Sequence, residues 1–371
     1  MLLRTIGLLV FLLLLFLAHP LPAETLTYAN PLHFGTNTGR EDHDELRDPC
    51  IIHEGGTYYL VFTMWPFTDS SAKDPTKPDM NSSPGIRLYF SKDLTHWTPG
   101  SWLVKSSALP ADSPYKHRFW APEIHKIGGK FYLVFTTDNW IKPEYNATGH
   151  FGYHAFIGVA DKVTGPYEHI SYMPDSACDT TIFGDDDGRV YASMPFGDLF
   201  VQELDLSRLS EGKVGYKTPR QKIVSSDFAD IGQPSPKYLE GPWAMKFGRR
   251  YFLFYAENYA AGYWTGVAYA DHPLGPWRKD PRGRVFWGGH LAVFDGPDGR
   301  PWFSYRGEKV PATRGLLCVD PFTIDASGVV RCGGPSTTPV TVPIAAISAK
   351  KRRPSPIRAR VGVQSLFHPA P

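Results

Sequence analysis

The sequence has almost no net charge, because 39 lysines and arginines stand against 37 aspartates and glutamates, giving +2 over 371 residues. Proteins that bind nucleic acid through its phosphates carry a clear excess of positive charge. The balance therefore gives no electrostatic reason to expect nucleic acid as a partner. A helical period of apolar residues is missing from every long stretch, so a predominantly helical fold is not expected either.

Long apolar runs are absent after residue 23. Residues 1–23 read MLLRTIGLLVFLLLLFLAHPLPA, with one basic residue, Arg4, before an apolar run over residues 6–18. That run is short for a membrane span and resembles the core of a signal peptide. We expect residues 1–23 to be removed on export, leaving a secreted or periplasmic protein without membrane insertion. An uncleaved membrane anchor is the alternative.

Cysteine is scarce, with four residues at Cys50, Cys178, Cys318 and Cys332 and no Cys-x-x-Cys pair, so a zinc site is not expected. An exported chain permits disulfides, and four cysteines allow three full pairings. We favour Cys318–Cys332, because the segment between them reads as a hairpin around residues 325–328.

Glycine, proline and aromatic residues are plentiful: the chain has 35 glycines and 34 prolines, and 14% of its residues are aromatic, which suits short strands joined by turns. One pattern recurs five times: a leading residue, a strand, a turn containing glycine, and an aromatic strand. The leading residues are Asp48, Ala121, Asp179, Glu240 and His290, which lie 73, 58, 61 and 50 residues apart.

Units of about 50–70 residues with four strands each are typical of propeller blades. The sequence therefore predicts an all-β fold, a five-bladed β-propeller with four-stranded blades around a central axis, over residues 24–334. Residues 335–371 are expected to form a closing segment and a basic, proline-rich tail that is partly disordered. A β-sandwich with accidentally similar hairpins is the alternative, and the constant order of parts in all copies argues against it.

Residues at equivalent starts of the innermost strands converge near one mouth of a propeller. Three carboxylates and an imidazole among the leading residues would then share one pocket, where like charges repel, and such clusters are usually functional. Hydrolysis of a glycosidic bond needs one acid to protonate the leaving oxygen and one carboxylate to activate water or attack the sugar. A third carboxylate can raise the pKa of the acid and orient it.

Five motifs in this order make the sequence similar to glycoside hydrolase family 43. They are RDP at 47–49, WAPE at 120–123, CDTTIFGDDDG at 178–188, EGP at 240–242 and GGH at 288–290. The resemblance covers most of the chain and implies a five-bladed propeller and an inverting, single-displacement mechanism.

The resemblance also implies roles for four leading residues. Asp48 takes the place of the general base, Glu240 that of the general acid, and Asp179 that of the residue that tunes and orients the acid. His290 takes the place of a histidine that contacts a central calcium ion or a water, so a structural calcium is expected at most and no cofactor is required. Inversion requires about 6.5–9.5 Å between the carboxyls of the base and the acid.

Four further residues are candidates for contact with a sugar. Trp120 precedes a leading residue, with core packing as the alternative. Arg306 follows Tyr305 where many relatives carry histidine, and it could equally be a surface arginine. Trp65 and Phe67 begin a long insert after the first aromatic strand, and such inserts often shape the walls of a propeller pocket.

These features predict an exported, exo-acting glycosidase that acts on wall polysaccharides or oligosaccharides and releases a terminal α-L-arabinofuranose or β-xylose. One alternative is a β-galactofuranosidase or galactan hydrolase of the same fold. The other is a non-catalytic propeller that only binds carbohydrate, against which the complete set of three carboxylates argues.

Overall fold

The computed structural model describes residues 24–32, 45–65, 69–73, 81–138, 154–308 and 315–345. The expected signal peptide and most of the expected tail lie outside these ranges. No helix within them is long and apolar enough to cross a membrane.

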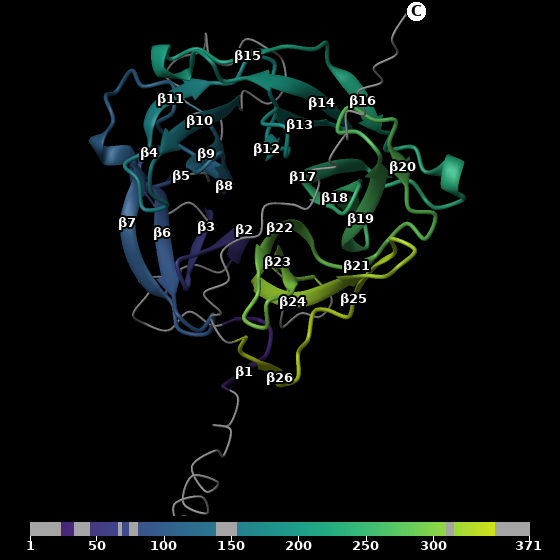
Figure 1. Ribbon diagram of the computed structural model, residues 1–371. Helices are drawn as coiled ribbons and strands as arrows, with labels where there is room; N and C mark the ends of the chain where they lie inside the picture. The colour runs from purple at the N-terminus through teal and green to yellow at the C-terminus, as the bar shows by residue number, and fades with distance from the viewer. Residues whose placement is uncertain are drawn as a thin grey trace, which may run out of the picture.

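Five antiparallel sheets stand around a central axis in chain order, which confirms the predicted five-bladed β-propeller (Figure 1). In each sheet the first strand lies nearest the axis and the later strands follow outward. The strands of blades 1 and 2 are β2 (Glu45–Glu54), β3 (Thr57–Trp65), β6 (Gly85–Ser91), β7 (Thr98–Lys105), β8 (Phe119–Ile127), β9 (Lys130–Thr137), β10 (His154–Ala160) and β11 (Glu168–Tyr172). Both blades have the four strands that the sequence predicts.

Blades 3 and 4 differ slightly, because two short strands take the outermost place in each. Their strands are β12 (Thr181–Gly184), β13 (Val190–Phe196), β14 (Asp198–Asp205), β15 (Gly215–Tyr216), β16 (Gln221–Val224), β17 (Tyr238–Phe247), β18 (Arg250–Tyr259), β19 (Gly262–Ala270), β20 (Arg278–Lys279) and β21 (Phe286–Trp287). Blade 5 consists of β22 (Gly289–Asp295), β23 (Pro301–Arg306), β24 (Leu317–Ile324) and β25 (Val330–Cys332).

Small elements decorate the blades. They are the hairpin of β4 (Asp69–Lys73) and β5 (Asn81–Ser82), and the 3₁₀ turns Ser106–Ala108, Leu209–Glu211 and Ala229–Ile231.

The second strand of a blade is buried on both faces, because it packs between two neighbouring blades. In β9, Leu133, Val134 and Phe135 are all at most 1% exposed although successive side chains point to opposite faces. This burial explains why the aromatic strands of the repeat read as nearly continuous apolar runs.

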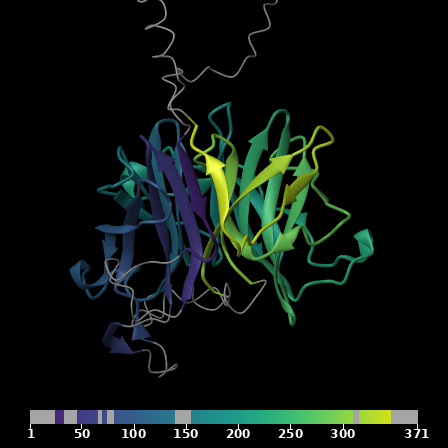
Figure 2. The same cartoon turned by 90° about the horizontal axis from the view of Figure 1, so that it is seen from below.

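The two ends of the described chain meet beside blade 5. Strand β1 (Thr25–Tyr28) pairs with β26 (Val340–Pro343), and Figure 2 shows the purple and yellow ends side by side. Asn30 then locks onto the blade: its amide nitrogen donates to Val319 O at 3.0 Å and to Asp320 Oδ2 at 2.8 Å. Its amide oxygen accepts from the Val319 N–H at 2.9 Å. Both ends of the described chain are thus fixed beside blade 5.

The expected Cys318–Cys332 disulfide is wrong, since all four cysteines are free. The predicted hairpin exists, with the Gly328 N–H donating to Asp325 O at its turn. Its register, however, puts Cys332 opposite Phe322, four residues along the strand from Cys318. At about 3.3 Å per residue that offset is roughly 13 Å, beyond the Cα separation that a disulfide can bridge.

Candidate active site

Each blade has one residue with left-handed backbone at or next to its leading position. In four of the blades, the hydrogen-bonded ladder between the first and second strands is interrupted at this residue. The left-handed residues, with φ between 43° and 63°, are Asp48, Ala121, Asp179, Gly241 and His290. In blade 4 the feature therefore falls on Gly241, and the predicted alignment of Glu240 with the other leading residues is wrong by one position. Glu240 instead matches Trp120 in blade 2 and Cys178 in blade 3.

Hydroxyl groups from the preceding blade hold two of these positions. A bulge of this kind re-aims a side chain, and a non-glycine residue in the left-handed region costs of order 1–3 kcal/mol, so its surroundings must fix it. The Ala121 N–H donates to Thr63 Oγ1 at 2.7 Å, and the Asp179 N–H donates to Thr136 Oγ1 at 3.1 Å. The sequence analysis missed both threonines, although each ends the same Val-Phe-Thr triplet of an aromatic strand.

Leading residues from blades 1, 3 and 5 form one cluster. His290 Nδ1 lies 3.1 Å from Asp48 Oδ1 and 3.7 Å from Asp179 Oδ2. The second oxygen of Asp48 accepts a hydrogen bond from the Thr63 hydroxyl at 2.6 Å, and the second oxygen of Asp179 accepts one from the Cys178 thiol at 3.1 Å. All four carboxylate oxygens thus have a polar neighbour, and the imidazole separates two like charges.

The charge of His290 follows from this environment. Burial alone would lower the pKa of the imidazole, but the carboxylates of Asp48 and Asp179 raise it to about 9. Burial raises the pKa of Asp179, and the positive charge of the imidazolium opposes this increase. Space for the ring comes from Gly241, where an added Cβ would lie 2.7 Å from His290 Cγ. The EGP motif of blade 4 therefore makes room for the GGH motif of blade 5.

The structure also bears on the metal that the resemblance implies at His290. Nδ1 of the ring faces two carboxylates, and Nε2 is buried without a hydrogen-bond partner among the described residues. The same ranges contain no group of three or more histidine, cysteine or acidic side chains placed to hold a metal ion. The donor set found here therefore does not itself form a cation site, and calcium at His290 stays a prediction.

Glu240 lies beside this cluster at the start of β17. Burial raises the pKa of its carboxyl to about 7, and the negative charge of Asp179 adds to the increase. The Tyr263 hydroxyl donates a hydrogen bond to Glu240 Oε1 and lowers this pKa in turn. A carboxyl with a pKa near neutrality can both keep and release a proton at physiological pH, as a general acid must.

Arg306 lies beside Tyr263, the residue that contacts Glu240, and its side chain is mostly buried. Its guanidinium carbon is 5.4 Å from the ring centre of Tyr263, and its Nη1 forms an ion pair with Glu308 Oε1. Arg306 pairs with Gly289 in the ladder of blade 5, so its backbone lies opposite the residue that precedes His290.

The other predicted sugar contacts are placed less completely. Trp120 is partly exposed, and its ring lies 5.4 Å from the guanidinium carbon of Arg118, which forms a buried ion pair with Asp138. Trp65 is the last residue of β3, but its side chain lies outside the described residues, as does the whole of Phe67.

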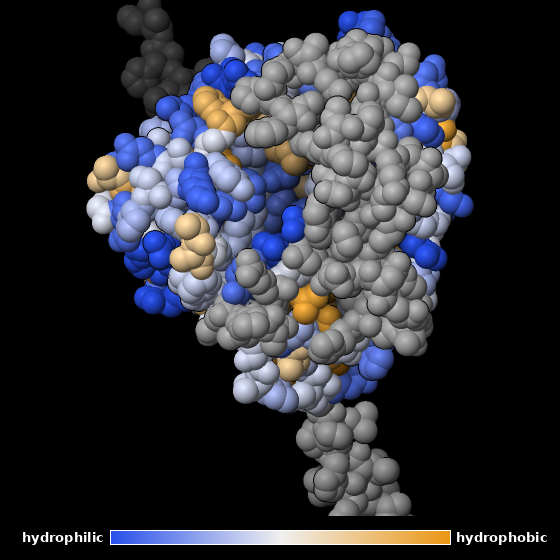
Figure 3. Space-filling view, turned by 180° about the vertical axis from the view of Figure 1, so that it is seen from behind, coloured by the Kyte–Doolittle hydropathy of each residue, from blue (hydrophilic) through white to orange (hydrophobic). Residues whose placement is uncertain are grey.

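On the face opposite to Figure 1 the molecule is hollowed at its centre, with hydrophilic residues in the hollow (Figure 3).

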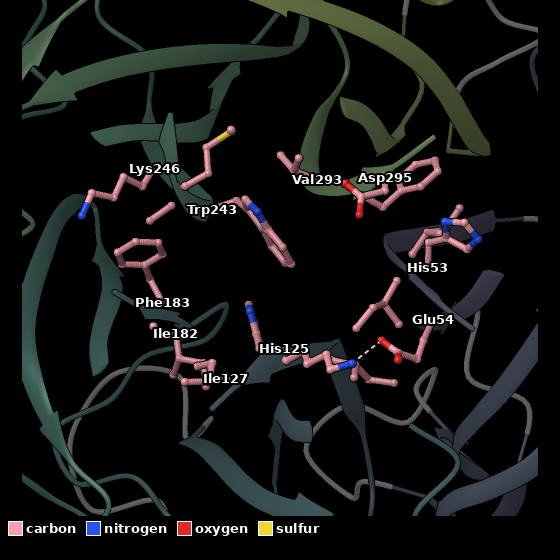
Figure 4. A pocket seen from close by; sticks show the side chains of 18 of the residues that line it. His53, Glu54, His125, Ile127, Ile182, Phe183, Trp243, Lys246, Val293 and Asp295 are labelled. Atoms are coloured by element: carbon pink, nitrogen blue, oxygen red, sulfur yellow. Dashed lines mark hydrogen bonds and ion pairs between the residues drawn. The ribbon is translucent and has the colours of Figure 1, made fainter. Parts of the chain in front are cut away.

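The innermost strands form a second chamber at their other end. Glu123, buried near the axis, accepts hydrogen bonds from the Thr181 hydroxyl at 2.6 Å and contacts His125 Nε2 at 2.8 Å, while the His125 ring stacks on Trp243. Beyond them lies a cavity of about 410 Å³ into which Trp243 points (Figure 4). Glu123 therefore belongs to the packing of the axis.

The sequence is similar to known proteins over most of its length. The model of the family described as glycosyl hydrolases family 43 matches residues 43–330. A xylosidase/arabinosidase 43B of Humicola insolens is 25% identical over 289 residues, which cover 73% of this chain and 49% of the relative. A beta-D-galactofuranosidase of Aspergillus niger is 24% identical over 276 residues, 65% of this chain and 72% of the relative.

Solved structures agree on the fold. A thermostable family-43 glycoside hydrolase superposes with a TM-score of 0.63 at 22% identity, over 86% of this chain and 100% of that one. The chain spans about half or less of the length of the first curated relatives it matches, at 49% and 36%. The family model covers most of the sequence and the propeller agrees with it, so the chain belongs to glycosyl hydrolases family 43.

Proposed function

We propose that the protein is an exported, inverting glycosidase that removes terminal sugars, α-L-arabinofuranose or β-xylose, from wall polysaccharides or oligosaccharides. The observation that carries the proposal is the pair formed by Asp48 and Glu240 in one cluster. Asp48 has both oxygens engaged as acceptors, while the pKa of Glu240 is raised to about 7 by burial. Paired carboxyls in different environments are the requirement of acid–base cleavage of a glycosidic bond.

The reaction proceeds in one displacement. Asp48 takes a proton from a water molecule, whose oxygen attacks the anomeric carbon from the side opposite to the leaving group. Glu240 gives its proton to the glycosidic oxygen as the bond from that oxygen to the anomeric carbon breaks. Asp48 is then protonated and Glu240 ionised, and exchange with solvent restores both. The anomeric configuration is inverted, because a single attack occurs at the opposite face.

Asp179 and His290 support this pair without touching the reacting atoms. The negative charge of Asp179 raises the pKa of Glu240, while the imidazolium of His290 offsets the repulsion between Asp48 and Asp179. The reaction as written needs no cofactor. A calcium ion at His290 would be structural, and dialysis against a chelator would then lower the melting temperature.

Substrate class rests on the relatives. Two of the curated relatives are named xylosidase/arabinosidase, which supports arabinofuranose or xylose as the sugar released. The second candidate is a β-galactofuranosidase, favoured by the Aspergillus niger relative, of which the match covers 72%. Both hypotheses use the same two carboxyls and differ in the sugar that the pocket accepts.

A screen of nitrophenyl arabinofuranoside, xyloside, galactofuranoside and galactoside distinguishes these candidates. Hydrolysis of one furanoside or xyloside with inverted product, detected by proton NMR of the first-formed anomer, is the expected result. Retention of configuration would remove the single-displacement mechanism. Binding of these sugars without hydrolysis of any would favour the non-catalytic alternative. Export is tested by locating the protein in cell fractions and sequencing its N-terminus.

A further inference from the structure

Tyr263 reaches the proposed acid from another strand of the same blade. It lies on β19, where it pairs with Asn258 of β18, whereas Glu240 on β17 pairs with Ala256 of β18. Its side chain therefore crosses the middle strand, and its hydroxyl donates to Glu240 Oε1. A contact across two ladders is invisible to the strand repeat, which is why the sequence analysis did not single out Tyr263.

The ring of Tyr263 fits between blades 4 and 5 because two small residues leave room for it. A Cβ added at Gly289 would lie 2.9 Å from both Cδ1 and Cε1 of Tyr263 and 3.0 Å from the Ala256 Cβ. The Gly288 N–H holds the tyrosine backbone by donating to Tyr263 O at 2.9 Å. Both glycines of the GGH motif thus contact Tyr263, one through its backbone N–H and the other by leaving space for the ring.

Blade 5 confines the ring further through Arg306. The Arg306 guanidinium carbon lies 5.4 Å from the ring centre, and Glu308 holds the guanidinium by an ion pair. The side chain of Tyr263 is only 6% exposed, and burial raises the pKa of its hydroxyl well above the usual value. The hydroxyl therefore stays protonated through the working pH range and remains a donor.

We propose that Tyr263 is a positioning residue that occupies Glu240 Oε1 and leaves Oε2 to carry the proton for the leaving group. This inference rests on the proposed function, since it concerns the acid of that reaction. A fixed donor on one oxygen sets the rotation of the carboxyl, so the proton on the other oxygen meets the glycosidic oxygen in one orientation. Arg306 and Glu308 hold the tyrosine in turn.

Tyr263→Phe tests the proposal, because it removes the hydroxyl and keeps the ring. For substrates with poor leaving groups, such as alkyl glycosides or oligosaccharides, kcat should fall by about 10- to 100-fold, the size expected for loss of a hydrogen bond to a charged group. Dinitrophenyl glycosides, whose leaving group needs little protonation, should lose much less. The basic limb of the kcat/KM profile should move to higher pH, because the ionised form of Glu240 loses a donor.

Tyr259→Phe is the matched control within blade 4. Tyr259 donates through its hydroxyl to Glu257 Oε2 at 3.0 Å, so the control also removes a tyrosine–glutamate hydrogen bond. It should keep the wild-type pH profile and leaving-group dependence. If Tyr259→Phe changed the pH profile and the leaving-group dependence as much as Tyr263→Phe does, both effects would be explained by a general loss of rigidity in blade 4.

The proposal is overturned if folded Tyr263→Phe keeps the wild-type basic limb and the wild-type ratio between poor and good leaving groups. Should Tyr263→Phe fail to fold, Gly289→Ala displaces the ring instead and must give the same selective loss on poor leaving groups. These outcomes require an active wild type. If the wild type hydrolyses no glycoside, the proposed function fails instead, and the two failures are distinguishable.

Discussion

The two ends of the propeller axis are built from the same five strands and differ in how they treat charge. At the mouth, the backbone adopts left-handed bulges that bring Asp48, Asp179 and His290 together, with acidic groups in excess. At the far end, the same strands run regularly around a cavity, where lysines face the acidic groups, as in the ion pair of Lys126 with Glu54 at 2.6 Å. Strain and unbalanced charge therefore mark the end proposed for catalysis, and regular packing marks the end that serves stability.

Glutamate-to-glutamine changes at the two ends should give the largest contrast. Glu240→Gln removes the proposed proton donor, so kcat on a substrate with a poor leaving group should fall by about 100- to 10,000-fold. The free energy of unfolding should change little. Glu54→Gln removes a partly exposed ion pair, and activity should stay at the wild-type level. Steady-state kinetics on both purified variants measure the contrast, and equal losses would erase the distinction between the ends.

Trp243→Ala should show the reverse behaviour. Trp243 is 8% exposed and stacks on His125 at the far end. Its truncation should lower the free energy of unfolding by about 3–5 kcal/mol, the usual range for a buried tryptophan. The folded fraction should retain its KM. Denaturant titration with activity measured in parallel tests this, and a kinetic defect without destabilisation would contradict it.

The pH dependence of activity should reflect the ionisation of Glu240 at the mouth of the propeller. In the proposed mechanism Glu240 must be protonated, and burial raises its pKa to about 7. The value of kcat/KM should therefore fall about tenfold per pH unit above that pKa. The residual activity of Glu240→Gln should lack this limb. A wild-type limb that persists in the variant would assign the titration to another group.

The free energy of unfolding should depend on pH in opposite directions through His290 at the mouth and His53 at the far end. The folded-state pKa of His290 is raised to about 9, so its contribution is fully present below the unfolded value of about 6.5 and is lost as pH rises through 9. At the far end, burial lowers the pKa of His53, so its contribution is lost as pH falls. Unfolding free energies measured against pH should lose the alkaline decline in His290→Gln and keep it in His53→Gln.

The smallest effect is expected where the bulge carries no catalytic group. Ala121 has the same left-handed backbone as Asp48 but no polar side chain. Glycine relieves a left-handed penalty of about 1–2 kcal/mol, partly offset by the loss of a buried methyl group. Ala121→Gly should therefore leave stability unchanged or raise it by up to about 1 kcal/mol. A clear destabilisation would mean that the bulge is not strained.

Sequence reasoning gave the fold and most of the cluster for a physical reason. Repeated hairpins carry their own period, so five blades and the leading residues Asp48, Asp179 and His290 could be predicted from spacing. The one-residue offset of Glu240 could not, because bulge position depends on backbone angles that the repeat does not encode. Tyr263 was missed because its contact crosses two strands. The Cys318–Cys332 pairing failed because a hairpin fixes which residues face each other only once its register is known.

The pairing of β1 with β26 has a consequence for synthesis. These strands lie 312 residues apart (residue 28 to residue 340), so β1 waits for its partner until almost the whole chain has been made. At ribosomal rates of about 5–20 residues per second, that wait lasts roughly 15–60 s. The hydrogen bonds of Asn30 to blade 5 also form late, because their partner Val319 lies on β24. A chain released before residue 340 would thus lack this two-stranded pair beside blade 5.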